Sequence, residues 1–151
     1  MEYSSYNKNR HTQVAAAALV KNSIVHVLET NEFDYGIPDN RIVAHSNLNP
    51  NDFLALLGSK DLNLYCSFSE SWGQVAIESL ALNVPCIYSN NSGISDIIES
   101  KKYVVSEYDN IVSISKKIKT ILIDNNVDFS LNSFQKRVNE LNNELINSYF
   151  N

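Results

Sequence analysis

Residues 67–74 read "SFSESWGQ" and stand directly before an apolar stretch with helical periodicity. A turn of this kind that opens a helix exposes free backbone N–H groups and the positive end of the helix dipole, which together bind phosphate. Glu70 lies in the turn and Glu78 lies eight residues later, a little over two helical turns along. One carboxylate would then face the mouth of the turn and the other its flank.

The spacing of these two glutamates is not decisive by itself. Glu99 and Glu107 are also eight residues apart, in a stretch with no such turn. The alternative is therefore that Glu70 and Glu78 are a solvated turn residue and a solvated helix residue.

The context of the turn favours a ligand site. An apolar, strand-like run ends at Cys66, and the following helix is expected to open near 72–74 and to end at Leu82. Asn83 suits the left-handed conformation of a helix stop, and Pro85 follows two residues on. In a parallel sheet, ligands bind at the carboxyl ends of the strands, which is where this turn would lie.

The elements that must position the turn alternate along the chain. Apolar runs typical of strands alternate with stretches of helical periodicity. Helices are expected over 13–21, 50–59 (capped by Asn51 or Asp52), 73–82, 95–100 and 110–124, and strands over 24–29, 41–46, 62–67, 85–89 and 103–106. This order predicts an α/β fold, a Rossmann-like three-layer α/β/α domain with a parallel sheet covered by helices on both faces.

The two ends of the chain differ from this regular pattern. Only Met1–Ser5 precedes the turn "YNKNRH", so the first strand is expected to be clipped and the chain to be a fragment of a longer protein. At the other end, residues 129–151 are expected to form an amphipathic helix that needs a surface to cover. No internal boundary is visible, which predicts a single domain over 1–151.

Composition excludes several classes of protein. The chain has 151 residues and a formal net charge of −5, and its lysines and arginines are scattered, which argues against a nucleic-acid partner. The longest apolar run, 14–20, is too short for a transmembrane segment, and a cytoplasmic protein, free or peripheral at a membrane, is expected. Cys66 and Cys86 fall in strand-like runs and are expected to be buried thiols.

A family resemblance is carried by "DLNLYCSFSESWGQVAIESLALNVPCIYSNNSGISDIIE", residues 61–99. This segment resembles the nucleotide-sugar half of retaining GT-B glycosyltransferases (glycosyl transferases group 1, family 4-like). The upstream segments "YNKNRHTQVAAAAL" and "IPDNRIVAHSNLNPNDFLALLGSKDLNLY" also fit that family, so the resemblance spans about 7–122. It implies the C-terminal, donor-binding half of a GT-B fold, without the N-terminal acceptor domain.

The resemblance also implies roles for individual residues. Glu70 would bind hydroxyls of the donor sugar, and Lys8 would neutralise the phosphate that leaves with the nucleotide, so these two are the candidate catalytic residues. Glu78 would hold the ribose hydroxyls. The diphosphate would meet the turn and its neighbours, of which the candidate binding residues are Ser71, Trp72, Gly73, Gln74 and Gly93.

The resemblance implies a metal-free site and no cofactor, with a nucleoside-diphosphate sugar as the donor substrate. The chain has no Asp-x-Asp pair to hold a divalent metal ion, which agrees with this expectation. Three positions depart from the family pattern. Tyr3 stands where an arginine that shares the diphosphate is usual, unless Arg10 replaces it. Ser92 replaces the first glycine of the turn before Gly93, and Asp96 stands at a glutamate position.

Simpler interpretations of single residues stay open at this point. Lys8 could be an ordinary surface lysine, and Trp72 could be a core residue and no more. His45 could approach a nucleobase at the end of its strand or be purely structural.

The predicted function is glycosyl transfer from a nucleotide sugar to a hydroxyl of a glycan, lipid or other acceptor, with retained configuration, through a hexosyltransferase-type enzyme. The isolated chain is expected to be inactive, because the acceptor would be held by the missing domain. Two alternatives remain: a catalytically incomplete binding or assembly module, and half of a nucleotide-sugar epimerase.

Overall fold

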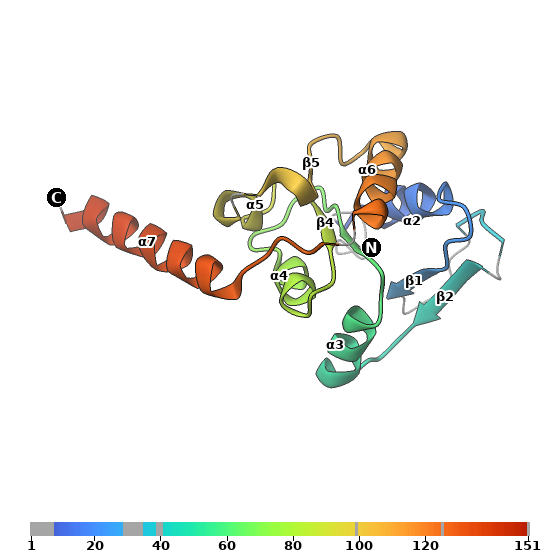
Figure 1. Cartoon of the computed structure of the whole chain (residues 1–151), viewed down its shortest axis with the longest axis horizontal. Coiled ribbons are helices and arrows are strands. Elements are labelled where there is room, and N and C mark those ends of the chain that lie inside the picture. The colour runs from blue at the N-terminus through green and yellow to red at the C-terminus, as the bar shows by residue number, and fades with distance from the viewer. Residues whose placement is uncertain (1–7, 29–34, 39–40, 99, 125, 151) are drawn as a thin grey trace, which may run out of the picture.

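The computed structural model describes residues 8–28, 35–38, 41–98, 100–124 and 126–150. The clipped strand predicted at Met1–Ser5 lies outside these residues. From Ile42 to Ile123, strands alternate with helices as predicted (Figure 1). The helices are α2 (Arg10–Ala18), α3 (Pro50–Gly58), α4 (Gln74–Ala81), α5 (Ile94–Ile97), α6 (Ile111–Ile123), α7 (Leu131–Phe150) and the 3-10 helix η2 (Lys101–Tyr103). The strands are β1 (Val25–Leu28), β2 (Ile42–His45), β3 (Asn63–Tyr65), β4 (Cys86–Ser89) and β5 (Val104–Val105).

The strand pairs are all parallel, which confirms the predicted α/β fold. They form two sheets, one of order β1-β2 and one of order β3-β4-β5. Val25 pairs with Ile42 in the first sheet, and Tyr65 pairs with Tyr88 in the second. Among the described residues, no strand pairs with both β1 and β3.

The core surrounds β4, whose four residues are all buried. Helices α2 and α6 lie side by side on one side of the strands, and α3 and α4 lie on the other (Figure 1). Cys66 and Cys86 are fully buried free thiols, as predicted. Burial raises the pKa of the Cys66 thiol to about 12, so it stays protonated.

Two helix ends can be compared with the residues predicted to cap or stop them. Asn83, directly after α4, has a φ of 60°, which confirms the predicted left-handed stop. The cap of α3 is Asn49, whose side chain accepts from the Asp52 N–H at 3.0 Å, so the prediction of Asn51 or Asp52 was wrong. Pro50 fits the first helical position, where no N–H is needed, and the cap is therefore the residue before it.

The amphipathic helix predicted at 129–151 is α7, which begins at Leu131. It runs away from the body of the domain (Figure 1). Phe134 packs against Phe129 at 5.9 Å between ring centroids and against the core, whereas Leu131 is 54% exposed. Among the described residues, no helix is long and apolar enough to cross a membrane.

Two buried tyrosines on either side of the β4–β5 pair provide a matched test of polar burial. The Tyr103 hydroxyl accepts from the Asp128 N–H at 2.8 Å, whereas the Tyr88 hydroxyl is buried and has no partner among the described residues. We expect Tyr103→Phe to lower the free energy of unfolding by about 0.5–1.5 kcal/mol, because it removes the hydrogen bonds of the hydroxyl with the Asp128 N–H and the Asn126 carbonyl. Tyr88→Phe should leave it unchanged or raise it. Chemical denaturation of both variants measures this, and equal losses would contradict it.

Candidate functional site

The turn between β3 and α4 is held by hydrogen bonds from the end of β4 and from the loop that follows it. The Ser89 hydroxyl donates to the Ser67 carbonyl at 2.8 Å, and the Gly93 N–H donates to the Ser71 carbonyl at 3.1 Å. Between these two bonds the Asn91 side-chain amide donates to the Phe68 carbonyl. Three carbonyls of the turn are therefore fixed by the last residue of β4 and by the loop that follows it, which together set the path of the backbone through residue 70.

Two glycines permit this close approach. A Cβ on Gly93 would lie 2.3 Å from the Ser71 carbonyl oxygen, so any side chain there would push the loop and the turn apart. Gly73 precedes α4 with a φ of +77°, and a Cβ on it would also lie 2.9 Å from Cγ2 of Ile94. Gly93 does not line the pocket described below; its place beneath the turn gives it a supporting position.

The first turn of α2 is joined to the end of β3 by two side-chain amides. Asn9 Nδ2 donates to the carbonyl of Cys66 at 3.0 Å, and Gln13 Oε1 accepts from the Cys66 N–H at 2.9 Å. Gln13 Nε2 also donates to the Lys8 carbonyl at 2.6 Å. These bonds place Lys8 at the carboxyl end of β3.

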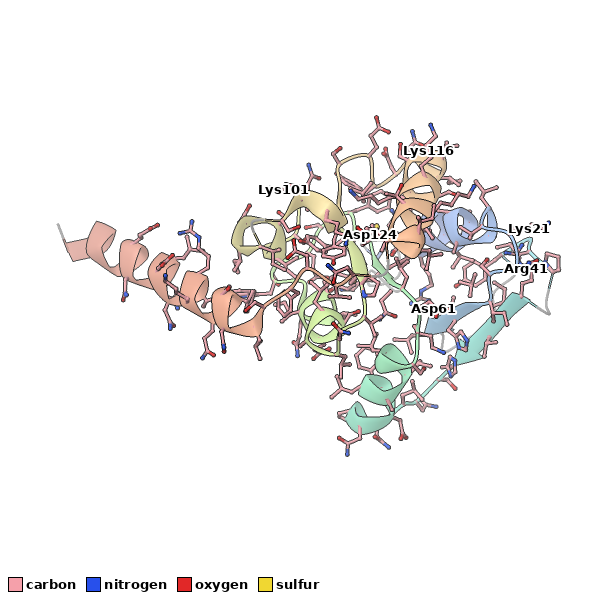
Figure 2. The ribbon with its side chains drawn as sticks, viewed as in Figure 1. Lys21, Arg41, Asp61, Lys101, Lys116 and Asp124 are labelled. Carbon is pink, nitrogen blue, oxygen red and sulfur yellow. The ribbon has the colours of Figure 1, made fainter. Side chains whose placement is uncertain are left out.

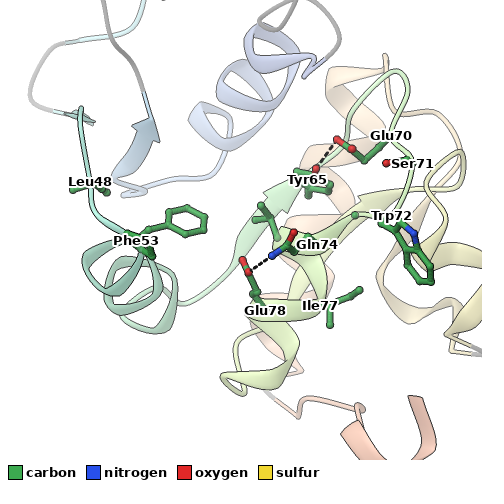
Figure 3. A pocket seen from close by; sticks show the side chains of 12 residues that line it. Leu48, Phe53, Tyr65, Glu70, Ser71, Trp72, Gln74, Ile77 and Glu78 are labelled. Carbon is green, nitrogen blue, oxygen red and sulfur yellow. Dashed lines mark hydrogen bonds between the residues drawn. The ribbon is translucent and has the colours of Figure 1, made fainter. Parts of the chain in front are cut away.

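Lys8, Tyr65 and Glu70 meet at that end of the strand. Lys8 Nζ forms an ion pair with Glu70 Oε2 and donates to the Tyr65 hydroxyl at 3.1 Å. The Tyr65 hydroxyl in turn donates to Glu70 Oε2 at 2.5 Å (Figure 3). Lys8 is therefore no isolated surface lysine, because its ammonium group belongs to a three-residue cluster.

The cluster fixes the charge of each member. Burial acts to raise the pKa of the Glu70 carboxyl, but the hydrogen bonds from Lys8 and Tyr65 outweigh it and the net shift is downward. Burial acts to lower the pKa of Lys8, and its bonds to Glu70 and Tyr65 raise it overall. Burial and the bond to Glu70 raise the pKa of Tyr65 to about 12. Near neutral pH the cluster holds a carboxylate, an ammonium and a neutral phenol.

An open pocket of about 760 Å³ lies between the turn, α4 and the start of α3 (Figure 3). Glu70 stands at one end of it, and Glu78 stands further along α4, where it accepts from Gln74 Nε2 at 2.8 Å. The lining residues are Leu48, Pro50, Phe53, Tyr65, Glu70, Ser71, Trp72, Gly73, Gln74, Val75, Ile77 and Glu78.

Six of the eight site residues predicted from the sequence thus line one pocket. A seventh, Lys8, does not line it but forms an ion pair with Glu70, which does. Trp72 is 53% exposed, so the interpretation of it as a core residue was wrong. The sequence analysis missed Tyr65 and Phe53. Tyr65 is the last residue of β3, and a polar tip at that position was the signal that could have identified it.

No cluster of three or more His, Cys, Asp or Glu side chains suited to a metal ion occurs in the part of the chain that the structure describes. His26 and His45 do meet, with Nδ1 of the first 2.8 Å from Nε2 of the second, but they contact each other on β1 and β2 and do not line the pocket.

The pocket, at the carboxyl ends of parallel strands and at the start of a helix, stands where α/β proteins bind ligands. The model of the family "Glycosyl transferases group 1" matches residues 27–140, which is more than half of the chain. The chain belongs to this family. It is therefore a glycosyltransferase domain, and its family implies a glycosyl donor and an acceptor as substrates.

A solved structure supports the same fold. The catalytic domain of cholesterol-alpha-glucosyltransferase from Helicobacter pylori matches with a TM-score of 0.63 at 17% identity, over 94% of this chain and 91% of that one. At this identity the likeness concerns the fold alone. No curated protein sequence gives a significant match.

The lowered pKa of Glu70 predicts how stability depends on pH. The carboxyl ionises more readily in the folded chain than in the unfolded one, where its ordinary pKa is 4.5. Its stabilising contribution is thus complete above that value and is lost as the pH falls through the lower, folded pKa. We expect the wild type to have a higher Tm than Glu70→Gln near neutral pH. The difference in Tm should shrink as the pH is lowered to about 3.

Thermal denaturation of both proteins across this range measures this difference. Glu140→Gln on α7 is the control, since exposed ion pairs such as that of Glu140 with Lys136 contribute little. A difference that stays constant or widens on acidification would contradict the prediction.

Proposed function

We propose that the pocket binds a nucleoside-diphosphate sugar and that the glycosyltransferase transfers its sugar to an acceptor hydroxyl with retained configuration. One observation carries the proposal. Two carboxylates, Glu70 and Glu78, line a single pocket of about 760 Å³ together with the start of α4 at the carboxyl end of β3, and the ammonium group of Lys8 forms an ion pair with Glu70. A donor of this class needs these groups in one place, namely a positive site for phosphate and acceptors for hydroxyls.

The diphosphate is assigned to the turn at Ser71–Gln74. The first N–H groups of an α-helix have no partner within the helix, and Gly73, Gln74 and Val75 at the start of α4 line this end of the pocket. The ammonium group of Lys8 forms an ion pair with Glu70 at the same turn. As the bond between sugar and phosphate breaks, charge develops on a phosphate oxygen, and a fixed ammonium group and helix dipole stabilise it.

The sugar and the ribose are assigned to the two glutamates. Glu70, at the turn, would accept hydrogen bonds from hydroxyls of the transferred sugar, and Tyr65 would keep its carboxylate in place. Glu78, two turns along α4, would accept from the ribose hydroxyls, with Gln74 as its neighbour. Phe53 and Leu48 form an apolar wall across from Glu78 (Figure 3), and such a wall suits the face of a nucleobase.

The acceptor is assigned to a second domain. Residues 1–151 would be a single donor-binding domain, and an N-terminal domain would bring a glycan, lipid or other hydroxyl acceptor against the sugar. No metal is required in this scheme, because Lys8 and the helix N-terminus supply the positive charge. Apart from the donor, no cofactor is needed.

Thermal shift with a panel of UDP, GDP and ADP and their common sugars tests the donor site. Ligand at 100 times its dissociation constant stabilises a fold by about 2.7 kcal/mol. We expect one nucleotide series to raise the Tm, and Glu78→Ala to weaken its binding by at least about tenfold, or about 1.4 kcal/mol. Glu140→Ala on α7 is the matched control and should keep the full shift. An equal shift in the two variants would exclude Glu78 from the site, and no shift with any nucleotide would argue against donor binding by this domain.

The need for a second domain predicts a separation of binding from turnover. The isolated chain should bind its donor and release no sugar to an added acceptor, because in this proposal the second domain holds the acceptor. Glycosyl transfer measured by product mass spectrometry, with donor at saturation, checks this. Turnover by the 151-residue chain would contradict it.

A further inference from the structure

Helix α6 has two different faces along its length. The face that packs into the core consists of isoleucines at helical spacing, namely Ile114, Ile118 and Ile121. The opposite face is exposed and follows the same spacing, and it consists of Val112, Lys116, Lys119 and Ile123. A helix that only covers a sheet needs one apolar face and carries polar residues on the other. The aliphatic residues on the outer face of α6 therefore need another explanation.

The two aliphatic side chains of this outer face are strongly exposed. Ile123 is 86% exposed, more than any other large apolar side chain in the part of the chain that the structure describes. Val112 is 54% exposed. About 16 Å of helix separates the two residues, and both lysines of the outer face lie between them. An apolar residue at each end of a basic stripe is the pattern of a helix that lies on a surface.

Further lysines lie beside this stripe. Lys117 Nζ donates to the carbonyl of Lys101 at 3.5 Å, so η2 lies next to α6. Figure 2 shows Lys101 and Lys116 on the same, upper side of the domain. Within the described ranges, none of these lysines forms an ion pair with a carboxylate. We use the name lysine surface for the set of Lys101, Val112, Lys116, Lys117, Lys119 and Ile123.

The charges around the lysine surface leave it positive. Helix α6 itself contains no acidic residue. Asp124, directly after the helix, is paired with Lys102 at 3.0 Å. Glu107 and Asp109 precede the helix, and Glu107 accepts a hydrogen bond from the Ser113 hydroxyl. The chain has a formal net charge of −5, so this group of unpaired lysines contrasts with the charge of the whole.

The residue types of the lysine surface indicate the kind of partner. Lysine is depleted in protein–protein interfaces, whereas Tyr, Trp and Arg are enriched there, and the lysine surface includes none of these three types. A single-stranded nucleic acid would require aromatic side chains for stacking, and it makes no use of an exposed isoleucine. An anionic bilayer suits both residue types. Ammonium groups reach the lipid phosphates, while lysine stems and aliphatic side chains enter the boundary with the acyl chains.

We propose that the lysine surface binds an anionic lipid bilayer, with α6 lying flat on the headgroups and with Val112 and Ile123 inserted at its two ends. The arrangement of the layers agrees with this orientation. Helices α2 and α6 cover one side of the strands, and α3 and α4, which line the pocket, cover the other (Figure 1). A bilayer against α6 therefore leaves the pocket open.

Co-sedimentation of the whole chain with lipid vesicles tests the proposal. The wild type should bind phosphatidylcholine vesicles that contain phosphatidylglycerol, but not vesicles of phosphatidylcholine alone, and added salt should weaken the binding. The double variant Lys116→Gln/Lys119→Gln should bind at least about tenfold more weakly, because each lysine near an anionic surface contributes roughly fivefold. Ile123→Ser should bind roughly fivefold more weakly, because it loses a buried aliphatic side chain.

The matched control is Lys136→Gln/Arg137→Gln, which removes the same charge from α7. Both of these side chains are already paired with Glu140, at 3.9 Å and 3.4 Å, so this variant should bind like the wild type. Thermal denaturation checks that every variant is folded. The proposal is overturned if the wild type does not bind the anionic vesicles, if the two double variants lose equal affinity, or if the wild type binds both kinds of vesicle equally.

Discussion

The geometry of the site depends on the backbone of Cys66, the first residue beyond the end of β3. Its N–H and C=O lie past the last residue of the strand, in the interior, where unpaired groups would each cost about 1–3 kcal/mol. Two side-chain amides of the α2 segment satisfy them, Gln13 for the N–H and Asn9 for the carbonyl. The requirement to pair the N–H and C=O groups of this buried residue therefore joins α2 to β3.

Several other features follow from this connection. Asn9 has a φ of 50° and does not cap α2 with its side chain, because that side chain reaches Cys66 and also the Tyr108 carbonyl at 2.6 Å. The bond to Tyr108 ties the loop after β5 to the same point. Lys8, which directly precedes Asn9, is thereby placed beside Tyr65, and its ammonium group forms an ion pair with Glu70. A carboxylate that the turn alone would leave in solvent becomes part of a fixed cluster.

The sequence predicts the local features of this arrangement well. Strands and helices lie within a few residues of their predicted bounds, because alternation of apolar residues and helical periodicity are properties of short stretches. The left-handed Asn83 and the pocket residues from Glu70 to Glu78 share this local origin. The cap of α3 is an exception, because Pro50 occupies the first helical position and the cap is therefore Asn49, not Asn51 or Asp52.

Non-local pairing accounts for what the sequence does not reveal. Asn9 and its acceptor at Cys66 are 57 residues apart, and Gln13 and Cys66 are 53 apart, so nothing in either stretch identifies the other. Both amides read as ordinary helix-start residues. Strand pairing is likewise non-local, because β1 pairs with β2 and β4 pairs with both β3 and β5. Tryptophan is a residue type that often packs in protein cores. Trp72, which lies between the serine turn and the left-handed Gly73, is instead 53% exposed and lines the pocket.

Under the proposed function, the Lys8–Glu70 ion pair exists both in the empty site and in the site with bound donor. Without donor, the ammonium group is satisfied by a carboxylate that it partly neutralises. When a diphosphate enters, Lys8 gains a second anion, and any shift toward it removes a donor from Glu70. Tyr65 makes this exchange tolerable, because its phenol, with a pKa of about 12, remains protonated and keeps donating to Glu70 Oε2 at 2.5 Å. The carboxylate thus stays ionised and oriented toward the sugar while the cation is shared, which is why the neutral member of the cluster matters as much as the charged ones.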